Sequence, residues 1–168
     1  MPTTAEKVAA FRRLHRPGAP FIVANAWDAG SARILQGLGA KALATTSSGF
    51  ALTLGRKDYG VAGEEALTHC RLVAGGVDIP VSADLENGFG LAPEDAAATI
   101  RAASETGLAG GSIEDSSRDA DDPIIDKSLA IAHRGRRRSR ARVKQRPVSR
   151  WAVRSLSALT DRSSKQPK

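Results

Sequence analysis

The sequence predicts an α/β protein whose parallel sheet forms part of a TIM-type (β/α)₈ barrel, with about four β/α units followed by a non-matching basic tail. Three observations lead to this prediction. Helix and strand signals alternate along residues 1–133. The strand segments are short, continuous apolar runs, which is typical of parallel sheets covered on both faces. Polar side chains follow the strands at their carboxyl ends, where barrels of this kind carry their active sites.

The first elements are a helix, a strand and a second helix. Thr3 and Glu6 have the spacing of a capping box, and the apolar residues behind them recur at helical intervals, so a helix begins here. The apolar run 21–24 predicts a buried strand. A helix is expected over 31–38, and Gly39 ends it.

Three further strands alternate with two helices. The strands are expected at 42–46, 79–83 and 111–113. One helix covers 64–74, and another begins at Pro93, because proline is favoured in the first turn and the acidic residues after it face the positive end of the helix dipole. The order of these elements favours parallel pairing of consecutive strands.

Carboxylates follow two of the predicted strands. Asp84 and Glu86 come directly after the third strand, and Glu114 follows the fourth. An isolated acid after a strand is more often a helix cap or a solvated loop residue, but two such positions on neighbouring strands favour a shared site. Carboxylate oxygens are the ligands that Mg²⁺ prefers. The sequence therefore predicts a Mg²⁺ site, with Mn²⁺ as the alternative ion, and an enzyme.

The charge changes sign near residue 133. Residues 1–133 hold 12 Lys or Arg and 17 Asp or Glu, a net charge of −5, whereas residues 134–168 hold 13 basic residues and 1 acidic residue, a net charge of +12. We therefore divide the chain into 1–133, the N-terminal part of a barrel, and 134–168, a basic tail predicted to be disordered. A full barrel needs about 250 residues. The sequence thus predicts a truncated barrel, and an out-of-frame or otherwise replaced C-terminus is our hypothesis for the tail.

The single cysteine and the absence of targeting signals predict the compartment. Cys70 cannot form an internal disulfide, which fits a reducing environment. The first residues do not form a signal peptide, and no apolar run reaches 18 residues. We expect a cytoplasmic protein with no membrane partner. Cys70 is expected to be a buried structural thiol, and His69 and His133 are expected at the surface.

Five motifs occur in the order seen in the isocitrate lyase and phosphoenolpyruvate mutase superfamily. They are NAWDAGSA (25–32), TSSGFA (46–51), LGRKD (54–58), ADLENGFG (83–90) and IED (113–115). More narrowly, the chain resembles the phosphoenolpyruvate phosphonomutase-like branch, often labelled carboxyvinyl-carboxyphosphonate phosphorylmutase, over roughly residues 5–133. The lyases of the superfamily carry a Lys-Cys-Gly-His-type loop where this chain has SSRDADDP (116–123), so a conventional isocitrate or methylisocitrate lyase is disfavoured.

This resemblance implies a Mg²⁺-dependent lyase or mutase that acts on a small 2-oxo or enol carboxylate through an enolate. A divalent cation stabilises an enolate as its charge develops. By the family pattern, Asp84 binds the ion directly, while Glu86, Glu114 and Asp58 hold its water molecules. The catalytic residues implied by the resemblance are Ser47, Ser48, Gly49 and Asp58. The residues that it implies for substrate binding are Trp27, Asp28, Ser48 and Gly49.

The same resemblance implies partners, and other interpretations stay open. The expected ligand is a small carboxylate, and intact relatives are expected to be homo-oligomers. One alternative is a catalytically inactive fragment. Another is a protein that binds nucleic acid or another polyanion non-specifically through the Arg-rich tail. No nucleic-acid-binding motif accompanies that tail, so a disordered tail is the preferred interpretation.

Overall fold

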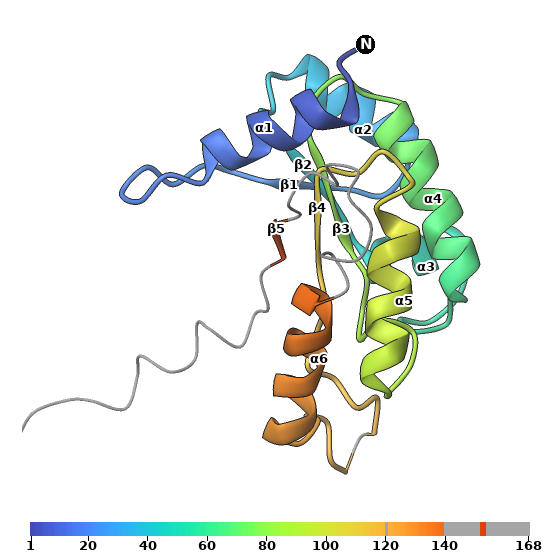
Figure 1. Ribbon diagram of the computed structural model, residues 1–168. Coiled ribbons are helices and arrows are strands. Elements are labelled where there is room, and N and C mark those ends of the chain that lie inside the picture. Colours follow the sequence, from blue (N-terminus) through green and yellow to red (C-terminus); the bar gives the residue numbers. More distant parts are fainter. Residues whose placement is uncertain (120, 140–151, 154–168) are drawn as a thin grey trace, which may run out of the picture.

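The computed structural model describes residues 1–119, 121–139 and 152–153 (Figure 1). In chain order the elements are α1 (Thr4–Leu14), β1 (Ala24–Ala26), α2 (Ala29–Gly37), β2 (Leu43–Thr45), α3 (Ser47–Thr53), α4 (Gly63–Gly75), β3 (Val81–Asp84), α5 (Pro93–Ala103), β4 (Gly110–Ser112), α6 (Lys127–Ser139) and β5 (Ala152–Val153). The strands form one sheet in the order β1-β2-β3-β4-β5, and every neighbouring pair is parallel. The predicted α/β class with consecutive parallel strands is confirmed.

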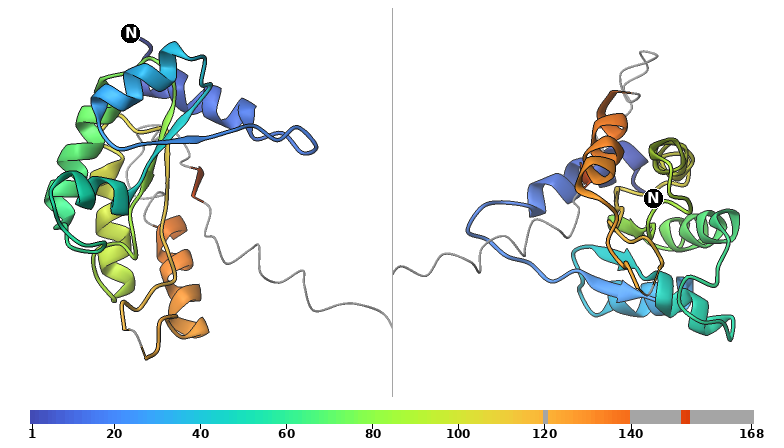
Figure 2. Two further views of the ribbon diagram at one scale, coloured as in Figure 1. Left: turned by 180° about the vertical axis from the view of Figure 1, so that it is seen from behind. Right: turned by 90° about the horizontal axis from the view of Figure 1, so that it is seen from below.

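Helices cover one side of the sheet and the end at which its strands begin. Helices α2, α4 and α5 lie along that side (Figures 1 and 2). Val8 and Phe11 of α1 pack against Ala42 and Ala109, which lie immediately before β2 and β4. Helix α1 therefore covers the end at which the strands begin. The opposite end, where the carboxyl ends of the strands lie, carries the site described below.

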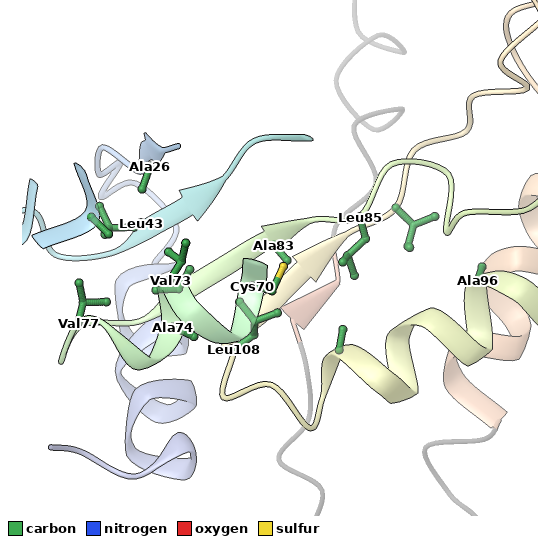
Figure 3. Close-up of a cluster of buried hydrophobic side chains, with 14 residues drawn as sticks. Ala26, Leu43, Cys70, Val73, Ala74, Val77, Ala83, Leu85, Ala96 and Leu108 are labelled. Atoms are coloured by element: carbon green, nitrogen blue, oxygen red, sulfur yellow. The ribbon is translucent and has the colours of Figure 1, made fainter. Parts of the chain in front are cut away.

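The main core lies between the sheet and its covering helices. Side chains of α4, including Val73 and Ala74, gather there with strand residues such as Leu43 and Ala83 (Figure 3). Cys70 belongs to the same cluster and is 2% exposed, as predicted. Burial raises the pKa of its thiol to about 12, so it is a packing residue.

Several details differ from the sequence predictions. Strand β1 begins at Ala24, at the end of the predicted strand 21–24. Phe21, before the strand, packs edge-on against Phe11 of α1, with 6.5 Å between the ring centroids. The prediction that His69 and His133 lie at the surface is wrong, since they are 7% and 1% exposed. His69 stacks on Phe50, and His133 lies within hydrogen-bond distance of the Leu91 carbonyl, 2.9 Å from its oxygen.

The C-terminal segment is described only in part. Helix α6, which the sequence analysis did not predict, crosses the expected boundary at 133/134. Strand β5 pairs with β4 through Ala152 and Val153. The rest of the segment that was predicted to be a disordered tail lies outside the described residues. None of the helices in the described part of the chain is long and apolar enough to cross a membrane.

Candidate active site

The two predicted acidic strand ends are neighbours in space. Asp84, the last residue of β3, is in register with Ser112, the last residue of β4. The backbone N–H of Glu114 donates to the Glu86 carbonyl at 2.7 Å, so the segments that follow β3 and β4 stay adjacent beyond the strands. Parallel pairing thus brings Asp84, Glu86 and Glu114 to one edge of the sheet.

Asp84 is held in a fixed direction by its neighbours. Its Oδ2 accepts hydrogen bonds from the backbone N–H and the hydroxyl of Ser47, at 3.0 and 2.8 Å. Its Oδ1 accepts from the backbone N–H of Glu86 at 3.2 Å, and its own N–H donates to Thr45 Oγ1 at 3.0 Å. Three donors fix the carboxylate before any ligand binds, which is the pre-organisation that a binding group needs.

Glu86 and Glu114 carry the electrostatic signature of the site. Glu86 is 1% exposed, and burial, reinforced by the charges of Asp84, Asp58 and Glu114, raises its pKa to about 7, although Arg118 opposes the shift. Burial also raises the pKa of Glu114, together with the charges of Asp84 and Asp58. The neighbouring negative charges make ionisation of Glu86 and Glu114 less favourable. The four carboxylates are therefore grouped closely enough to act on one another.

Two residues that the sequence analysis did not select complete the cluster. The hydroxyl of Tyr59 donates to Glu114 Oε2 at 2.8 Å. Arg118 forms an ion pair with Glu86, and its guanidinium carbon lies 5.0 Å from the centroid of the Tyr59 ring. The only sequence signals for them were the position of Tyr59 next to Asp58 and a lone cation in an acidic loop.

The backbone is strained at these same residues. Tyr59, Glu86 and Arg118 have φ values of 60°, 49° and 65°, in the left-handed region that side chains other than glycine rarely adopt. Such conformations cost about 1–3 kcal/mol each and cluster at functional sites. Their meeting around one group of carboxylates supports this edge of the sheet as the functional site.

The remaining predicted residues lie close by in different roles. Asp58 is exposed and accepts from the backbone N–H of Tyr59 at 3.1 Å. The carboxylate of Asp28 caps α2 through the N–H of Ser31, at 2.6 Å. Trp27, which is 47% exposed, packs on Gly49, where an added Cβ would lie 2.9 Å from the indole ring. Of the predicted substrate residues, Asp28 is thus already used as a helix cap.

Ser47, Ser48 and Gly49, which the resemblance implies for catalysis and substrate binding, form the first turn of helix α3. Thr46 caps this helix through a hydrogen bond that its side chain accepts from the N–H of Gly49 at 3.2 Å. The cap aims the first turn of α3 at Asp84, which explains why Ser47 reaches that carboxylate.

A cavity of about 10 Å³ lies behind Ser47 and is bordered by Asp84, Glu86 and His69. This is room for about one water molecule. The His69 ring stacks on Phe50 with 3.8 Å between centroids, and its Nε2 is a buried atom that lacks a hydrogen-bond partner among the described residues. Burial lowers the pKa of His69, with the charge of Asp28 opposing the shift. The imidazole is therefore a neutral packing group behind the site.

His69 is expected to make the protein less stable in mild acid. Its pKa in the folded protein lies below the ordinary value of 6.5, so as the pH falls through about 6.5 the unfolded chain takes up a proton that the folded chain does not. This contribution should lower the free energy of unfolding of the parent relative to that of His69→Phe, which keeps a ring on Phe50, between about pH 7.5 and pH 5.5. Glu86, whose raised pKa of about 7 contributes with the opposite sign in this range, is present in both proteins. Urea unfolding of both proteins at the two pH values measures the difference, and an unchanged pH dependence would contradict the assignment.

The acidic side chains of the site supply hard oxygen donors. Within the described residues, no group of three Asp, Glu, His or Cys side chains that could hold a metal ion is found. The family resemblance implies a different arrangement, in which one carboxylate binds the ion directly and other carboxylates hold its water molecules. Mg²⁺ commonly keeps several waters when bound by one or two carboxylates. The mutual repulsion of the four acids is the property that such an ion would relieve.

The family model of phosphoenolpyruvate phosphomutase matches residues 11–148 of this chain. The chain belongs to the phosphoenolpyruvate phosphomutase family. The resemblance seen in the five sequence motifs is thereby confirmed. The family match continues past residue 133, where the sequence analysis placed the end of the barrel part.

Solved structures agree with this family assignment. A protein of Burkholderia cenocepacia J2315 assigned as a lyase or mutase is 43% identical, with a TM-score of 0.82 over 90% of this chain and 55% of its own. A 2,3-dimethylmalate lyase of the phosphoenolpyruvate mutase/isocitrate lyase superfamily is 26% identical, with a TM-score of 0.71 over 95% of this chain and 55% of its own. A phosphonopyruvate hydrolase, solved with oxalate and Mg²⁺, shares the fold at 15% identity and a TM-score of 0.75, over 92% of this chain and 52% of its own.

The chain spans about half the length of the relatives that it matches. An uncharacterised protein of Mycobacterium tuberculosis is 34% identical over 122 residues, which are 73% of this chain and 45% of that protein. The chain thus belongs to a superfamily that includes lyases and mutases.

Proposed function

We propose that this chain carries the metal-binding part of a Mg²⁺-dependent lyase or mutase that acts on a small 2-oxo or enol carboxylate through an enolate. Family membership supports the class of reaction. The observation that carries the proposal is a group of four acids: Asp84, Glu86 and Glu114 lie at the carboxyl ends of β3 and β4, and Asp58, in the loop after α3, is close enough to act on Glu86 and Glu114. Since the chain covers about half of its relatives, the activity of a whole barrel is part of this proposal.

Asp84 is the residue assigned to direct contact with the ion. It is the acid whose direction is fixed by the most donors, two of them from Ser47. Glu86, Glu114 and Asp58 would hold water molecules of the ion. When bound, Mg²⁺ would supply positive charge where an enolate oxygen develops negative charge. Mn²⁺ has similar preferences for oxygen ligands and is the expected substitute.

The substrate would be held by the rim beside this group. Trp27 forms an apolar wall against Gly49, and the start of α3 presents Ser48 and Gly49 next to Ser47. Hydroxyl and backbone N–H groups of this kind bind carboxylates through short, oriented hydrogen bonds. The carboxylate of Asp28 would keep Trp27 in place by capping α2, so its effect on the substrate would be indirect.

Calorimetric titration with MgCl₂ tests the metal assignment. Replacing Asp84→Asn keeps the size of the side chain and removes its charge, and we expect Mg²⁺ binding to weaken roughly 100-fold or more. Asp78→Asn is the matched control, because Asp78 is exposed and lies before the opposite end of the same strand. Equal Mg²⁺ affinity in the parent and in Asp84→Asn would remove Asp84 from its proposed role.

Product formation is the complementary measurement. We expect Mg²⁺-dependent release of pyruvate or a related 2-oxo acid from a carboxylate whose C–C or P–C bond can break to an enolate, and loss of this release in Asp84→Asn. A chain that binds Mg²⁺ but releases no 2-oxo acid from any such substrate would instead be the inactive fragment considered above.

A further inference from the structure

The group of four acids has a positively charged side chain, that of Arg118, beside it. Arg118 pairs with Glu86, whose side chain is 2% exposed, while the Arg118 side chain is 31% exposed. The guanidinium also lies over the Tyr59 ring, and the Tyr59 hydroxyl donates to Glu114. Glu86, Arg118, Tyr59 and Glu114 thus form a continuous series of contacts that joins the segments after α3, β3 and β4.

This cation balances a charge that burial would otherwise make costly. A buried carboxylate without a partner is strongly destabilising, and Glu86 is surrounded by three other acids. Arg118 comes from a short segment, and its position there is held by a hydrogen bond from its own N–H to Ser116 Oγ at 3.3 Å. Only this segment, and no strand or helix, places the guanidinium at Glu86.

A divalent cation on the same carboxylates would supply the same compensation. Two cations drawn to one group of acids repel each other, and the repulsion is large at short separation in a partly buried site. Binding of the ion and pairing of Arg118 with Glu86 therefore oppose each other. By thermodynamic linkage, the free energy by which the bound ion weakens the Arg118–Glu86 pair equals the free energy by which that pair weakens binding of the ion.

We propose that Arg118 is a positioning residue that neutralises the metal-free acidic group and leaves Glu86 when a divalent cation binds, so that occupancy of the site controls segment 116–119. This inference rests on the proposed function, because it requires a cation at Asp84 and Glu86. The exchange is reversible and involves no covalent step. Departure of Arg118 also frees one face of the Tyr59 ring at the rim of the site.

Calorimetric titration with MgCl₂ of the full chain and of Arg118→Gln tests the competition. Removing the competing charge should tighten Mg²⁺ binding roughly tenfold. Arg118→Lys keeps the charge and should bind Mg²⁺ with nearly the parent affinity. Arg101→Gln is the matched control, because Arg101 is exposed on α5 and makes the same change in net charge. Unchanged or weaker binding by Arg118→Gln would overturn the proposal.

Hydrogen exchange measured by mass spectrometry gives a second readout that needs no variant. In the parent, saturating Mg²⁺ should speed amide exchange in a peptide that covers 114–119, because the Arg118 pair no longer holds the segment. Slower or unchanged exchange there would also overturn the proposal. If neither the parent nor Arg118→Gln binds Mg²⁺, both the proposed function and the role of Arg118 are wrong. If both bind Mg²⁺ equally well, only the role of Arg118 is wrong.

Discussion

Replacing Gly88→Ala is expected to lower the free energy of unfolding by about 3 kcal/mol. Gly88 has a φ of +89°, a conformation that costs a residue with a Cβ about 1 kcal/mol. An added Cβ would also lie 2.7 Å from the Cα of Ala96 in α5, and backbone at this distance cannot move aside like the end of a flexible side chain. Overpacking of this kind adds about 1–3 kcal/mol. Urea unfolding of the parent and the variant measures the loss.

Gly39→Ala separates the two causes. Gly39 has a φ of +92°, but no atom lies within 4 Å of the position that its Cβ would take. Its replacement should therefore cost only the conformational part, about 1 kcal/mol. Equal losses in the two variants would show that the approach of α5 is not tight. A larger loss at Gly88 would show that the turn after Glu86 is fixed by contact with α5, through Ala96 and through the Thr99 hydroxyl, which donates to the Gly88 carbonyl at 2.8 Å.

The part of the site that the sequence predicts is the part that depends on strand order alone. Asp84 and Glu114 follow two consecutive strands, and consecutive strands of a β/α protein pair in parallel. That rule brings their carboxyl ends to one edge without any knowledge of the loops. The cap of α1 was predictable for a similar reason, because Thr3 and Glu6 bond within a single turn.

The contacts of Tyr59 and Arg118 could not be predicted in this way. Each residue lies in a loop and has a positive φ, so its direction depends on the packing of segments that are far apart in the sequence. The Tyr59 hydroxyl crosses 55 positions to reach Glu114, and Arg118 crosses 32 to reach Glu86. Periodicity and spacing contain no information on such pairs.

Helix α3 and the burial of His69 were missed for one common reason. The helix has only seven residues, Ser47–Thr53, which is too short to show a helical period in the sequence. Because it forms, Phe50 is turned onto α4 and covers His69. His69, which was expected at the surface, is therefore buried by helix α3, an element that the sequence pattern did not predict.

Lys7→Met is expected to lower the free energy of unfolding by roughly 2–4 kcal/mol, although methionine fills nearly the same volume. Lys7 is 6% exposed, and its ammonium group donates to the carbonyls of Ala74 and Val77 at 2.9 and 2.6 Å. These carbonyls lie at the end of α4 and just beyond it, where the helix dipole favours a cation. Methionine leaves both acceptors without this donor, and an unpaired buried polar group costs about 1–3 kcal/mol.

Lys41→Met provides the matched control, because Lys41 is exposed and the same change there should stay within about 0.5 kcal/mol. Urea unfolding of both variants compares them directly. The comparison also tests how the two ends of the sheet are connected. Lys7 fastens α1, which covers the amino ends of the strands, to the helix that carries His69 behind the acidic group. If Lys7→Met were no more harmful than Lys41→Met, packing of Val8 and Phe11 alone would hold α1 in place, and the buried ammonium would contribute nothing to that contact.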